Sequence, residues 1–373
     1  MKDDVQENKN QEEKYAALSQ RQLMWRKFKQ NRLAIVGGII VLLFYTLAIF
    51  AGFIAPYPLD ARFVSNIHTP PNRPRFVDNE GDFSLRPFIY GLKMERDMET
   101  LEKYYTLDKT EKNYIHFFAR GQEYKFWGIV DTNLHLFATK EKAPLFILGT
   151  DKMGRDLFSR IIYGARVSLS VGLIGVVLSL ILGSILGAVS GYYGGMVDHF
   201  IQRTIELMMS FPAIPMWMAL AAAVPADWSP IKVYFGITVI LSLLTWGGLA
   251  RQIRGMVLSV REEEYTLAAK SVGANNIFII LKHILPNVMS HILVIATLSI
   301  PGMILGETAL SFLGLGIRPP MTSWGVLLEE AQHVRVLTLH PWLVTPALAV
   351  IIVILGFNFL GDGIRDAADP YSG

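Results

Sequence analysis

The sequence predicts an all-α polytopic membrane protein with about six transmembrane helices and a small folded insert between the first two. The chain has 373 residues, of which 51% are apolar and only 18% charged. Soluble domains carry about a quarter charged residues. The shortage of charge is uneven, because long charge-free runs alternate with stretches of ordinary polarity. This alternation is typical of a chain that crosses a membrane several times.

The charge-free runs give the position of each predicted span. A helix needs about 20 apolar residues to cross ~30 Å of hydrocarbon. The first run is too long for the roughly 7–15-residue apolar core of a signal peptide, so we expect it to remain as a membrane helix. The fifth run is interrupted by Pro301 and Glu307. In chain order the predicted spans are Leu33–Ala55, one helix inside Val167–Val197, Leu207–Ala226, Val233–Ala250, His291–Gly314 and Pro341–Gly361.

Basic residues beside the spans predict the orientation. Short cytoplasmic flanks carry an excess of Lys and Arg. Such cations precede the first run and fill the loop between the fourth and fifth runs, and they are Arg21, Arg26, Lys27, Lys29 and Arg32, then Arg251, Arg254, Arg261, Lys270 and Lys282. Both regions are therefore expected in the cytoplasm. With six spans, both termini are expected there as well. Met24, Trp25 and Phe28 among the first set fit either a short amphipathic helix on the membrane interface or an unstructured basic flank.

The segment Pro56–Thr150 differs from its surroundings in being mixed in charge and rich in aromatic residues. A structureless loop of this length is unusual, so we expect a small extracytoplasmic α+β module. Tyr124–Val130 suggests a strand, and the Lys- and Glu-rich Glu95–Lys112 suggests a solvated helix. The module could be a platform for an extracytoplasmic partner or an elaboration that stabilises the outer face. The expected organisation is a tail with an interfacial helix (1–32), a first span (33–55), the insert (56–150) and a core (151–373) that includes the loop 251–290.

That cytoplasmic loop carries a second amphipathic pattern. Glu262–Val272 predicts a short helix with acidic residues at its N-terminal end, where the helix dipole favours them. Tyr265, Ala268, Ala269 and Val272 recur at i, i+3, i+4 and i+7 and form one apolar stripe with small residues at its centre. Gly273 is expected to end the helix, and a second short helix to stop near Pro286. Such a surface can dock into a groove of another protein or pack as a re-entrant hairpin on its own bundle.

The same loop resembles a known family motif. Ala268-Ala269-x-x-x-Gly273, with Leu285-Pro286 further on, resembles the "EAA" loop of ABC-importer permeases, in which this helix sits in a cleft of the ATPase subunit. Two positions depart from the general pattern. Leu267 replaces the usual glutamate, with Glu264 about one turn earlier, and His283 stands where isoleucine is usual. Both departures resemble the peptide and nickel transporter branch.

Three further segments resemble that branch in the expected order. They are Leu148–Arg160, Glu307–Gly316 and Phe357–Asp366, the last followed by Asp369-Pro370. The nearest likeness is to the C-type permease subunit of oligopeptide or dipeptide importers, over about 24–55 and 146–373. The resemblance implies a type I ABC importer fold that forms half of a translocation pathway. It also implies a second homologous permease, two P-loop ATPase subunits, an extracytoplasmic peptide-binding protein and a peptide substrate, all at the lipid bilayer of the cell membrane.

Three sets of candidate residues follow. The resemblance assigns ATPase coupling to Glu264, Tyr265, Ala268, Ala269, Val272 and Gly273. Small residues at a spacing of four let helices approach closely, which favours helix packing over a pore lining for Ser179, Gly183, Gly187 and Gly191. Glu307, Asp151 and Arg155 are candidates for a pore or gate. The ordinary alternatives are a hydrogen bond from Glu307 to a neighbouring helix and a short interfacial helix capped by Asp151 or Thr150.

Several functions are disfavoured by what the sequence lacks. It contains no cysteine, no His-x-x-x-His pair and no Gly-x-x-x-x-Gly-Lys-Ser/Thr loop, so we expect no metal site and no ATP bound by this chain. ATP and Mg would be used by partner subunits, and this chain would be non-catalytic. The alternatives are a nickel or other small-solute ABC importer, an ion-driven secondary transporter, which predicts inverted repeats that the sequence does not show, and a membrane sensor.

Overall fold

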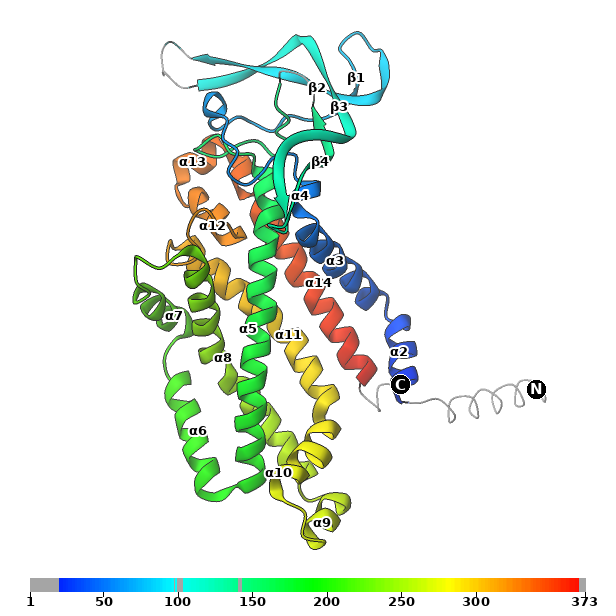
Figure 1. Cartoon of the computed structure of the whole chain (residues 1–373), viewed down its shortest axis with the longest axis vertical. Helices are drawn as coiled ribbons and strands as arrows, with labels where there is room; N and C mark the ends of the chain where they lie inside the picture. The colour runs from blue at the N-terminus through cyan, green and yellow to red at the C-terminus, as the bar shows by residue number, and fades with distance from the viewer. Residues whose placement is uncertain (1–19, 97, 99–102, 140–142, 369–373) are drawn as a thin grey trace, which may run out of the picture.

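The computed structural model describes residues 20–96, 98, 103–139 and 143–368. It is an elongated bundle of helices with a β-sheet at one end and a short helix, α9 (Glu264–Ser271), at the other (Figure 1). We call these the sheet end and the loop end. The tail before residue 20 and Asp369-Pro370 lie outside the described residues.

The predicted polytopic helical fold is confirmed. Five helical segments of the described chain are long and apolar enough to cross a membrane. They are α3 (Arg32–Ile49), α5 (Leu157–Tyr193), α8 (Pro230–Val260), the continuous stretch Asn276–Phe312 and the stretch Pro341–Ala368, which contains α14 (Thr345–Ala368). A bent pair, α6 (Gly195–Met209) and α7 (Ala213–Ala222), makes a sixth if it is counted as one span.

That bent pair corrects the predicted third span. Instead of one helix over Leu207–Ala226, α6 and α7 meet at an angle of 84° across Ser210–Pro212. Pro212 has no backbone N–H to donate, and proline disfavours helical backbone at the residue before it. A charge-free run therefore does not form a straight helix here.

The fifth span corrects a second expectation. The helix that begins the second half of the loop, α10 (Asn276–Ile279), does not stop near Pro286. It continues through one π turn, η2 (Ile280–Ile284), into α11 (Leu285–Phe312). Pro286 comes just after this π turn, and the locally altered hydrogen-bond pattern lets the helix continue past a residue that has no N–H to donate. The stretch Asn276–Phe312 is thus one helix.

The insert is a four-stranded antiparallel sheet in the order β1-β2-β3-β4. Its strands are β1 (Arg75–Val77), β2 (Phe83–Arg96), β3 (Lys103–Phe126) and β4 (Val130–Thr139). The helix predicted over Glu95–Lys112 is wrong, since these residues pair β2 with β3 in the register Glu95↔Tyr104. Tyr104, Tyr105 and Thr106 suit a strand, and neighbouring charges lie on its exposed face. The strand predicted over Tyr124–Val130 is instead the end of β3, a turn and the start of β4.

The described part of the insert contains one 3₁₀ turn, η1 (Val64–Asn66), and no α-helix after α4 (Ala51–Ile54). The expected α+β module is therefore a β module. Its small core contains Ile89, Ile115 and Leu145. The β3–β4 register shifts between Arg120 and Tyr124, which bends β3 strongly so that it curls down beside α4 and the start of α5 (Figure 1).

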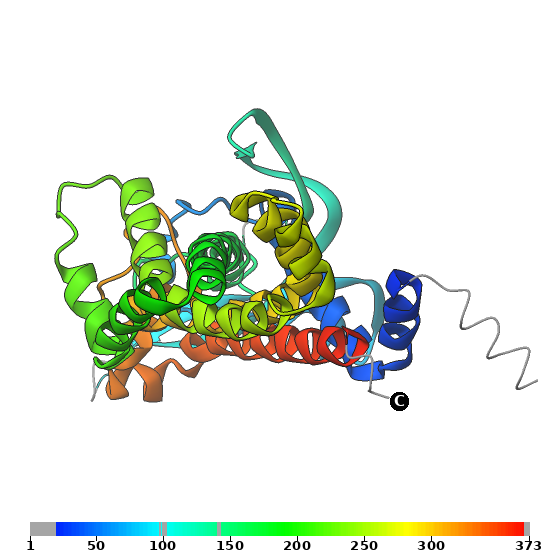
Figure 2. The same ribbon diagram turned by 90° about the horizontal axis from the view of Figure 1, so that it is seen from below.

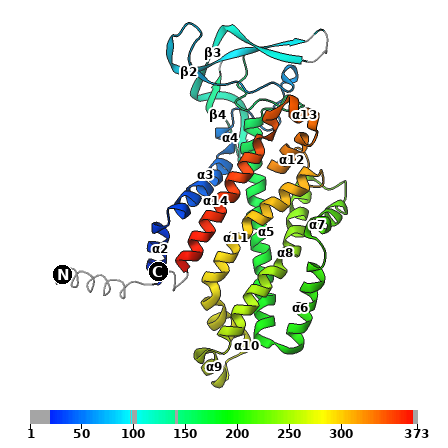
Figure 3. The same ribbon diagram turned by 180° about the vertical axis from the view of Figure 1, so that it is seen from behind.

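At the N-terminus, α2 (Gln20–Gln30) lies beside the end of α14 (Figure 3). The helix expected around Met24, Trp25 and Phe28 is thus present. Asn31 caps α3 by accepting a hydrogen bond from the Ala34 N–H at 3.1 Å. α3 and α14 then run together, because Gly37 lets the backbone of Gly356 approach: a Cβ on Gly37 would lie 2.5 Å from that carbonyl oxygen.

Candidate functional site

The predicted loop helix is present as α9 and is shorter than the predicted Glu262–Val272. Glu264 lies in its first turn, and the Thr266 hydroxyl donates to the Val260 carbonyl at 3.0 Å, which closes the corner between α8 and α9. After Val272, Gly273 adopts a φ of +82°, the left-handed backbone that glycine tolerates at a helix end. Asn275 then caps α10 by accepting from the Ile277 N–H at 3.1 Å.

The predicted apolar stripe of α9 does not point in a single direction. Tyr265, Ala268 and Val272 are exposed, and Val272 is 85% exposed. Ala269 is only partly exposed and packs on a buried cluster that includes Ile279 and Ile280. Ala269 therefore packs α9 against its own bundle, whereas Tyr265, Ala268 and Val272 remain exposed.

Sequence reasoning missed part of this exposed surface. Leu267, noted only as a departure from a motif, is 45% exposed. Ile277, Phe278 and Leu281 on α10 and η2 are 61%, 50% and 57% exposed. We call the exposed apolar residues of α9, α10 and η2 the loop-end surface; they are Tyr265, Leu267, Ala268, Val272, Ile277, Phe278 and Leu281. The i, i+3, i+4 pattern of α9 could not reveal the exposure of Ile277, Phe278 and Leu281, which lie on the next helix.

Charged and polar groups fix this loop to the rest of the bundle. Asp198 on α6 receives two hydrogen bonds from the Arg254 guanidinium of α8, each 2.6 Å long. The Arg261 guanidinium donates to the carbonyl oxygens of Gly191 and Tyr192 at the end of α5. A forked arginine–carboxylate pair is directional as well as strong. These contacts hold the ends of α5, α6 and α8 together beneath α9.

The four small residues predicted for helix packing all face α8. The Ser179 hydroxyl donates to the Ser242 carbonyl at 3.0 Å. A Cβ on Gly183 would lie 2.9 Å from Leu249 Cβ, and one on Gly191 would lie 2.9 Å from the Arg254 carbonyl oxygen. The closest approach is at Gly187, where a Cβ would lie 2.5 Å from the Ala250 oxygen. Any larger side chain on this stripe would push α5 and α8 apart.

Glu307 is fully buried in α11 and lines no described pocket. Its carboxylate accepts from the hydroxyls of Ser168 on α5, at 3.1 Å, and Ser311, at 2.7 Å. The Ser168 hydroxyl oxygen in turn accepts from the Trp324 N–H at the start of α12 (Trp324–Glu329). In this conformation Glu307 joins α5, α11 and α12 through hydrogen bonds.

Asp151 and Arg155 lie in a second buried polar cluster, at the start of α5. Asp151 Oδ2 accepts from Arg155 Nε at 2.7 Å and from Arg160 Nη1, while its Oδ1 accepts from the N–H groups of Met153 and Arg155. Burial opposes ionisation of Asp151, but Arg160, Arg155 and these N–H groups together lower its pKa. The carboxylate is therefore held charged by partners on its own turn and on α5.

Asp156 is the residue that caps α5. Its carboxylate accepts from the Ser159 N–H at 2.7 Å. The sequence pointed to Asp151 or Thr150 as the cap, and the geometry assigns that role to Asp156. Burial raises the pKa of Asp156 to about 7, since its hydrogen bonds do not compensate for the loss of water and the Asp151 charge adds to the rise.

The polar cluster around Asp151 extends to residues that no pattern in the sequence connects. His68 Nε2 lies 2.7 Å from Glu330 Oε1, and the same oxygen accepts from the Lys152 N–H at 2.8 Å. The His68 ring also stacks on His340, with centroids 4.1 Å apart. Glu330 begins η3 (Glu330–Gln332), which follows α12. The segment before β1 is thereby joined to the residues before α5 and to the turn after α12.

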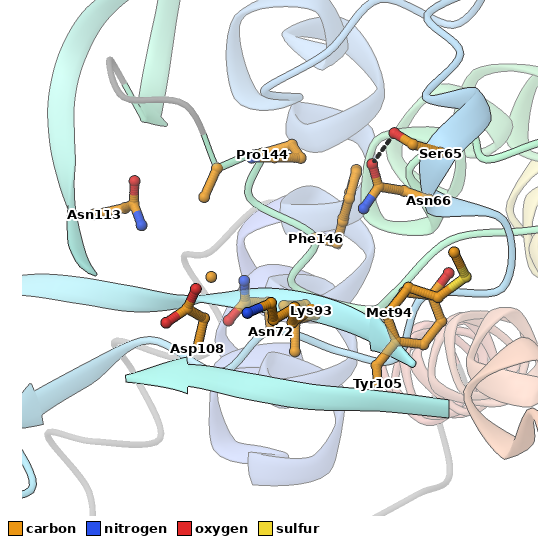
Figure 4. A pocket seen from close by; sticks show the side chains of 13 residues that line it. Ser65, Asn66, Asn72, Lys93, Met94, Tyr105, Asp108, Asn113, Pro144 and Phe146 are labelled. Atoms are coloured by element: carbon orange, nitrogen blue, oxygen red, sulfur yellow. Dashed lines mark hydrogen bonds between the residues drawn. The ribbon is translucent and has the colours of Figure 1, made fainter. Parts of the chain in front are cut away.

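The insert also contains a pocket of about 410 Å³ between the strands and the segment after β4. Asn72, Lys93, Tyr105 and Asp108 contribute polar groups to its wall (Figure 4). Asn72 is already engaged, because its amide donates to the Tyr90 carbonyl at 3.1 Å. None of the residues singled out in the sequence lines this pocket.

The chain matches two known protein families. Residues 161–371 match the binding-protein-dependent transport system inner membrane component, and residues 19–71 match the N-terminal transmembrane domain of oligopeptide transport permease C. The first match includes α9, Glu307 and the four small residues of α5. Because the first match begins at residue 161 and the second ends at residue 71, most of the insert lies between the two matches.

Individual relatives extend the likeness along nearly the whole chain. A dipeptide transport system permease protein of Bacillus subtilis is 31% identical over 358 residues, which are 96% of this chain and 88% of that protein. An oligopeptide transport system permease protein of Haemophilus influenzae is 42% identical over 223 residues, 60% of this chain and 69% of that protein. A glutathione transport system permease protein of Escherichia coli is 31% identical over 346 residues, 93% of this chain and 89% of that protein.

Among solved structures, the MetNI methionine ABC transporter in inward-facing conformations gives a TM-score of 0.45 at 16% identity, over 58% of this chain and 100% of that chain. The family match covers more than half of the present sequence, and the Bacillus subtilis relative covers almost all of it. This chain therefore belongs to the family of binding-protein-dependent transport system inner membrane components.

Proposed function

We propose that this chain is a permease subunit of an ATP-driven peptide importer. Family membership gives the transport role, and relatives named for dipeptide, oligopeptide and glutathione transport support a peptide cargo over nickel. An ion-driven carrier or a sensor does not fit that membership. The chain forms half of the translocation pathway, and a second, homologous permease forms the other half.

The observation that carries the coupling mechanism is the loop-end surface. Its exposed apolar residues lie on a short helix and the turn after it, at the extreme loop end of the molecule (Figure 1). An apolar helix face of this kind fits a hydrophobic groove on a partner protein. The proposed partners are two ATPase subunits, which bind ATP and Mg and whose clefts receive α9 and its counterpart. This chain supplies no catalytic group.

The contacts of α9 explain how movement of the ATPases would reach the membrane. Ala269 and the buried cluster beneath it tie α9 to α8 and to the start of Asn276–Phe312. When ATP binding brings the two ATPases together, α9 moves with α8 and α11 as one body. A rigid-body rotation of this kind opens the pathway on the opposite side.

The proposed orientation follows from the positive charges. Arg26, Lys27, Lys29 and Arg32 lie at the start of the first span, and Arg251, Arg254 and Arg261 lie at the loop end. Because Lys and Arg favour the cytoplasmic flank, the loop end and both termini are placed in the cytoplasm. The sheet end then faces outward, where an extracytoplasmic binding protein would deliver the peptide.

The test is the substitution Ala268→Arg on α9. Ala268 is exposed, so the change leaves the fold intact and adds a long charged side chain to the docking face. The matched control is Leu85→Arg, which puts the same side chain on an 89% exposed position of β2 at the sheet end. We expect the tagged control chain to co-purify with the second permease and the ATPases, and the Ala268→Arg chain to lose the ATPases alone.

Uptake in proteoliposomes completes the test. The assembled transporter should import a radiolabelled tripeptide only with ATP, and should not import ⁶³Ni²⁺. Tripeptide uptake that continues without ATP would favour an ion-driven carrier instead. ATP-dependent ⁶³Ni²⁺ uptake without tripeptide uptake would show that the cargo is nickel, and it would leave the proposed coupling mechanism unchanged. Full ATPase retention by Ala268→Arg would refute docking through α9.

A further inference from the structure

The turn between β3 and β4 is an exposed apolar tip. It consists of Phe126-Trp-Gly-Ile-Val130, without a charge. Trp127, Ile129 and Val130 are 57%, 84% and 55% exposed. The charged pair Lys125 and Asp131 stands directly above these residues, with Nζ and Oδ1 3.9 Å apart. A charge-free tip below a charged collar is the polarity expected of a segment that crosses from water into a membrane interface.

The backbone of the turn makes the tryptophan unexpected. Trp127 has a φ of +54°, and Gly128 follows with +72°. Successive positive φ values in a hairpin favour Asn, Asp or Gly, and a bulky residue there is an outlier. The chain therefore places a large aromatic side chain at a position where the turn itself favours a small polar one. The side chain must contribute through something other than the turn.

Contacts with α3 fix the depth of the tip. The Phe126 ring lies 6.2 Å from the ring of Phe50, the residue that follows α3. Arg166 on α5 donates to the Ala48 carbonyl at 2.6 Å and places its guanidinium 5.6 Å from the centre of the Trp127 ring. The tip is thus level with the last turn of the first span.

That last turn marks the edge of the hydrocarbon layer. α3 has 18 residues, which at 1.5 Å each span about 27 Å, close to the ~30 Å thickness of a bilayer core. Viewed from below, the β3–β4 hairpin projects sideways beyond the helices (Figure 2). The tip therefore lies beside the bundle at membrane level, where no other described element covers it.

We propose that Phe126–Val130 inserts into the lipid leaflet on the sheet side, at the boundary between head groups and acyl chains. Trp and Tyr are enriched at this boundary, and here Trp127 and Tyr163 both lie against the Arg166 guanidinium. The partner is the phospholipid surface itself. The insert is then held at two points, by its chain connections to the bundle and by the bilayer, whichever cargo the transporter carries.

The experiment uses the absence of cysteine from the natural chain. Ile129→Cys carries a single nitroxide spin label in the full chain, reconstituted into phosphatidylethanolamine–phosphatidylglycerol nanodiscs. The matched control is Leu85→Cys, an equally exposed apolar residue on β2 of the same sheet. Power saturation compares collisions with oxygen, which partitions into lipid, and with nickel-EDDA, which stays in water. We expect the oxygen-to-nickel ratio to be several-fold higher at position 129 than at position 85.

Each other outcome overturns the proposal in a distinguishable way. Equal ratios at the two positions would place the tip in water. A label at position 129 that neither reagent reaches, in the chain alone or in the assembled transporter, would mean that protein covers the tip. Neither result bears on peptide uptake or on ATPase docking, so this proposal and the proposed function fail independently.

Discussion

The two halves of α5 are held by opposite means. At the sheet end, its first turns lie in a buried polar cluster in which Asp151, Asp156 and Arg160 are almost completely shielded from water. Toward the loop end, Gly183, Gly187 and Gly191 bring its backbone against α8. One half is positioned by directional hydrogen bonds, and the other by close approach of two smooth surfaces.

This difference has a mechanical meaning. Directional bonds between buried charges resist displacement in every direction, and breaking them leaves a charge without water. Small-residue packing resists separation of two helices but contains few directional bonds. We therefore expect α5 to be anchored at the sheet end, and to stay in contact with α8 while the loop end moves. Three substitutions test this contrast, taken from the largest expected effect to the smallest.

Arg160→Ala should give the largest loss. It leaves the buried Asp151 carboxylate with one cation fewer, and removal of one partner from a buried ion pair costs about 3–5 kcal/mol. The free energy of unfolding, measured by denaturant titration of the purified chain in mixed micelles, should fall by this order. Arg155→Ala is the control, since the Arg155 side chain is more exposed, 14% against 8%, and its loss should cost less. Equal losses would mean that burial does not set the strength of this cluster.

Asp156→Asn should change how stability depends on pH. The folded-state pKa of Asp156 is about 7, above the ordinary value of 3.8, so folding takes up a proton between these values. Stability from this group is present at low pH and is lost as the pH rises through 7. Asparagine is also a good cap. Relative to the variant, the wild-type chain should therefore lose on the order of 4 kcal/mol between pH 4 and pH 8.

Asp151→Asn is the matched control of opposite sign. The pKa of Asp151 is lowered, so its contribution is present above the unfolded value and is lost only as the pH falls below about 3.8. Over pH 4–8 the difference between wild type and this variant should stay nearly constant. Thermal midpoints in nanodiscs across that range separate the two cases. A difference between wild type and Asp156→Asn that does not change with pH would show that Asp156 is ionised in the folded protein across this range.

Gly187→Ala should change stability least of the three. Whether it destabilises or stabilises the protein decides whether α5 and α8 are tightly packed at this position. The added Cβ would lie 2.5 Å from the Ala250 oxygen, so α5 and α8 must separate, at a net cost of about 1 kcal/mol after the better helix propensity of alanine is included. Gly302→Ala on α11 is the control, because a Cβ there meets nothing within 4 Å. That variant should be stabilised by up to about 1 kcal/mol. Two changes of the same sign would refute tight packing at Gly187.

The spans could be predicted well from the sequence, because a membrane-spanning helix requires mainly sufficient length and apolar side chains. Every long apolar run except Leu207–Ala226 lies mostly within one long helix. That run does not form one helix because Pro212 breaks it. The end of the loop was predicted wrongly because the helix passes Pro286 by way of the π turn that precedes it. Both errors depend on the backbone around a proline, which composition does not contain.

The insert and the polar clusters could be predicted less far. Charges on Glu95–Lys112 suggested a helix, whereas pairing with a distant strand decides the structure of such a segment. The 2.7 Å contact between His68 and Glu330 joins residues 262 positions apart, so no local pattern could reveal it. On α9, the periodicity identified Ala269 with the other stripe residues, but only the fold shows that it faces inward.

The stretch Asn276–Phe312 connects the loop end to the buried site of Glu307 without an intervening loop, although it contains a π turn and Pro301. From Asn276, beside α9, to Glu307 there are 31 steps of 1.5 Å, a lever of about 47 Å. Because no loop interrupts it, a displacement imposed near α9 is carried along this helix. Motion of α9 would therefore reach the Glu307–Ser168–Trp324 hydrogen bonds. These bonds, which join α5, α11 and α12, would be the first polar contacts at the far end of the helix to respond to that motion.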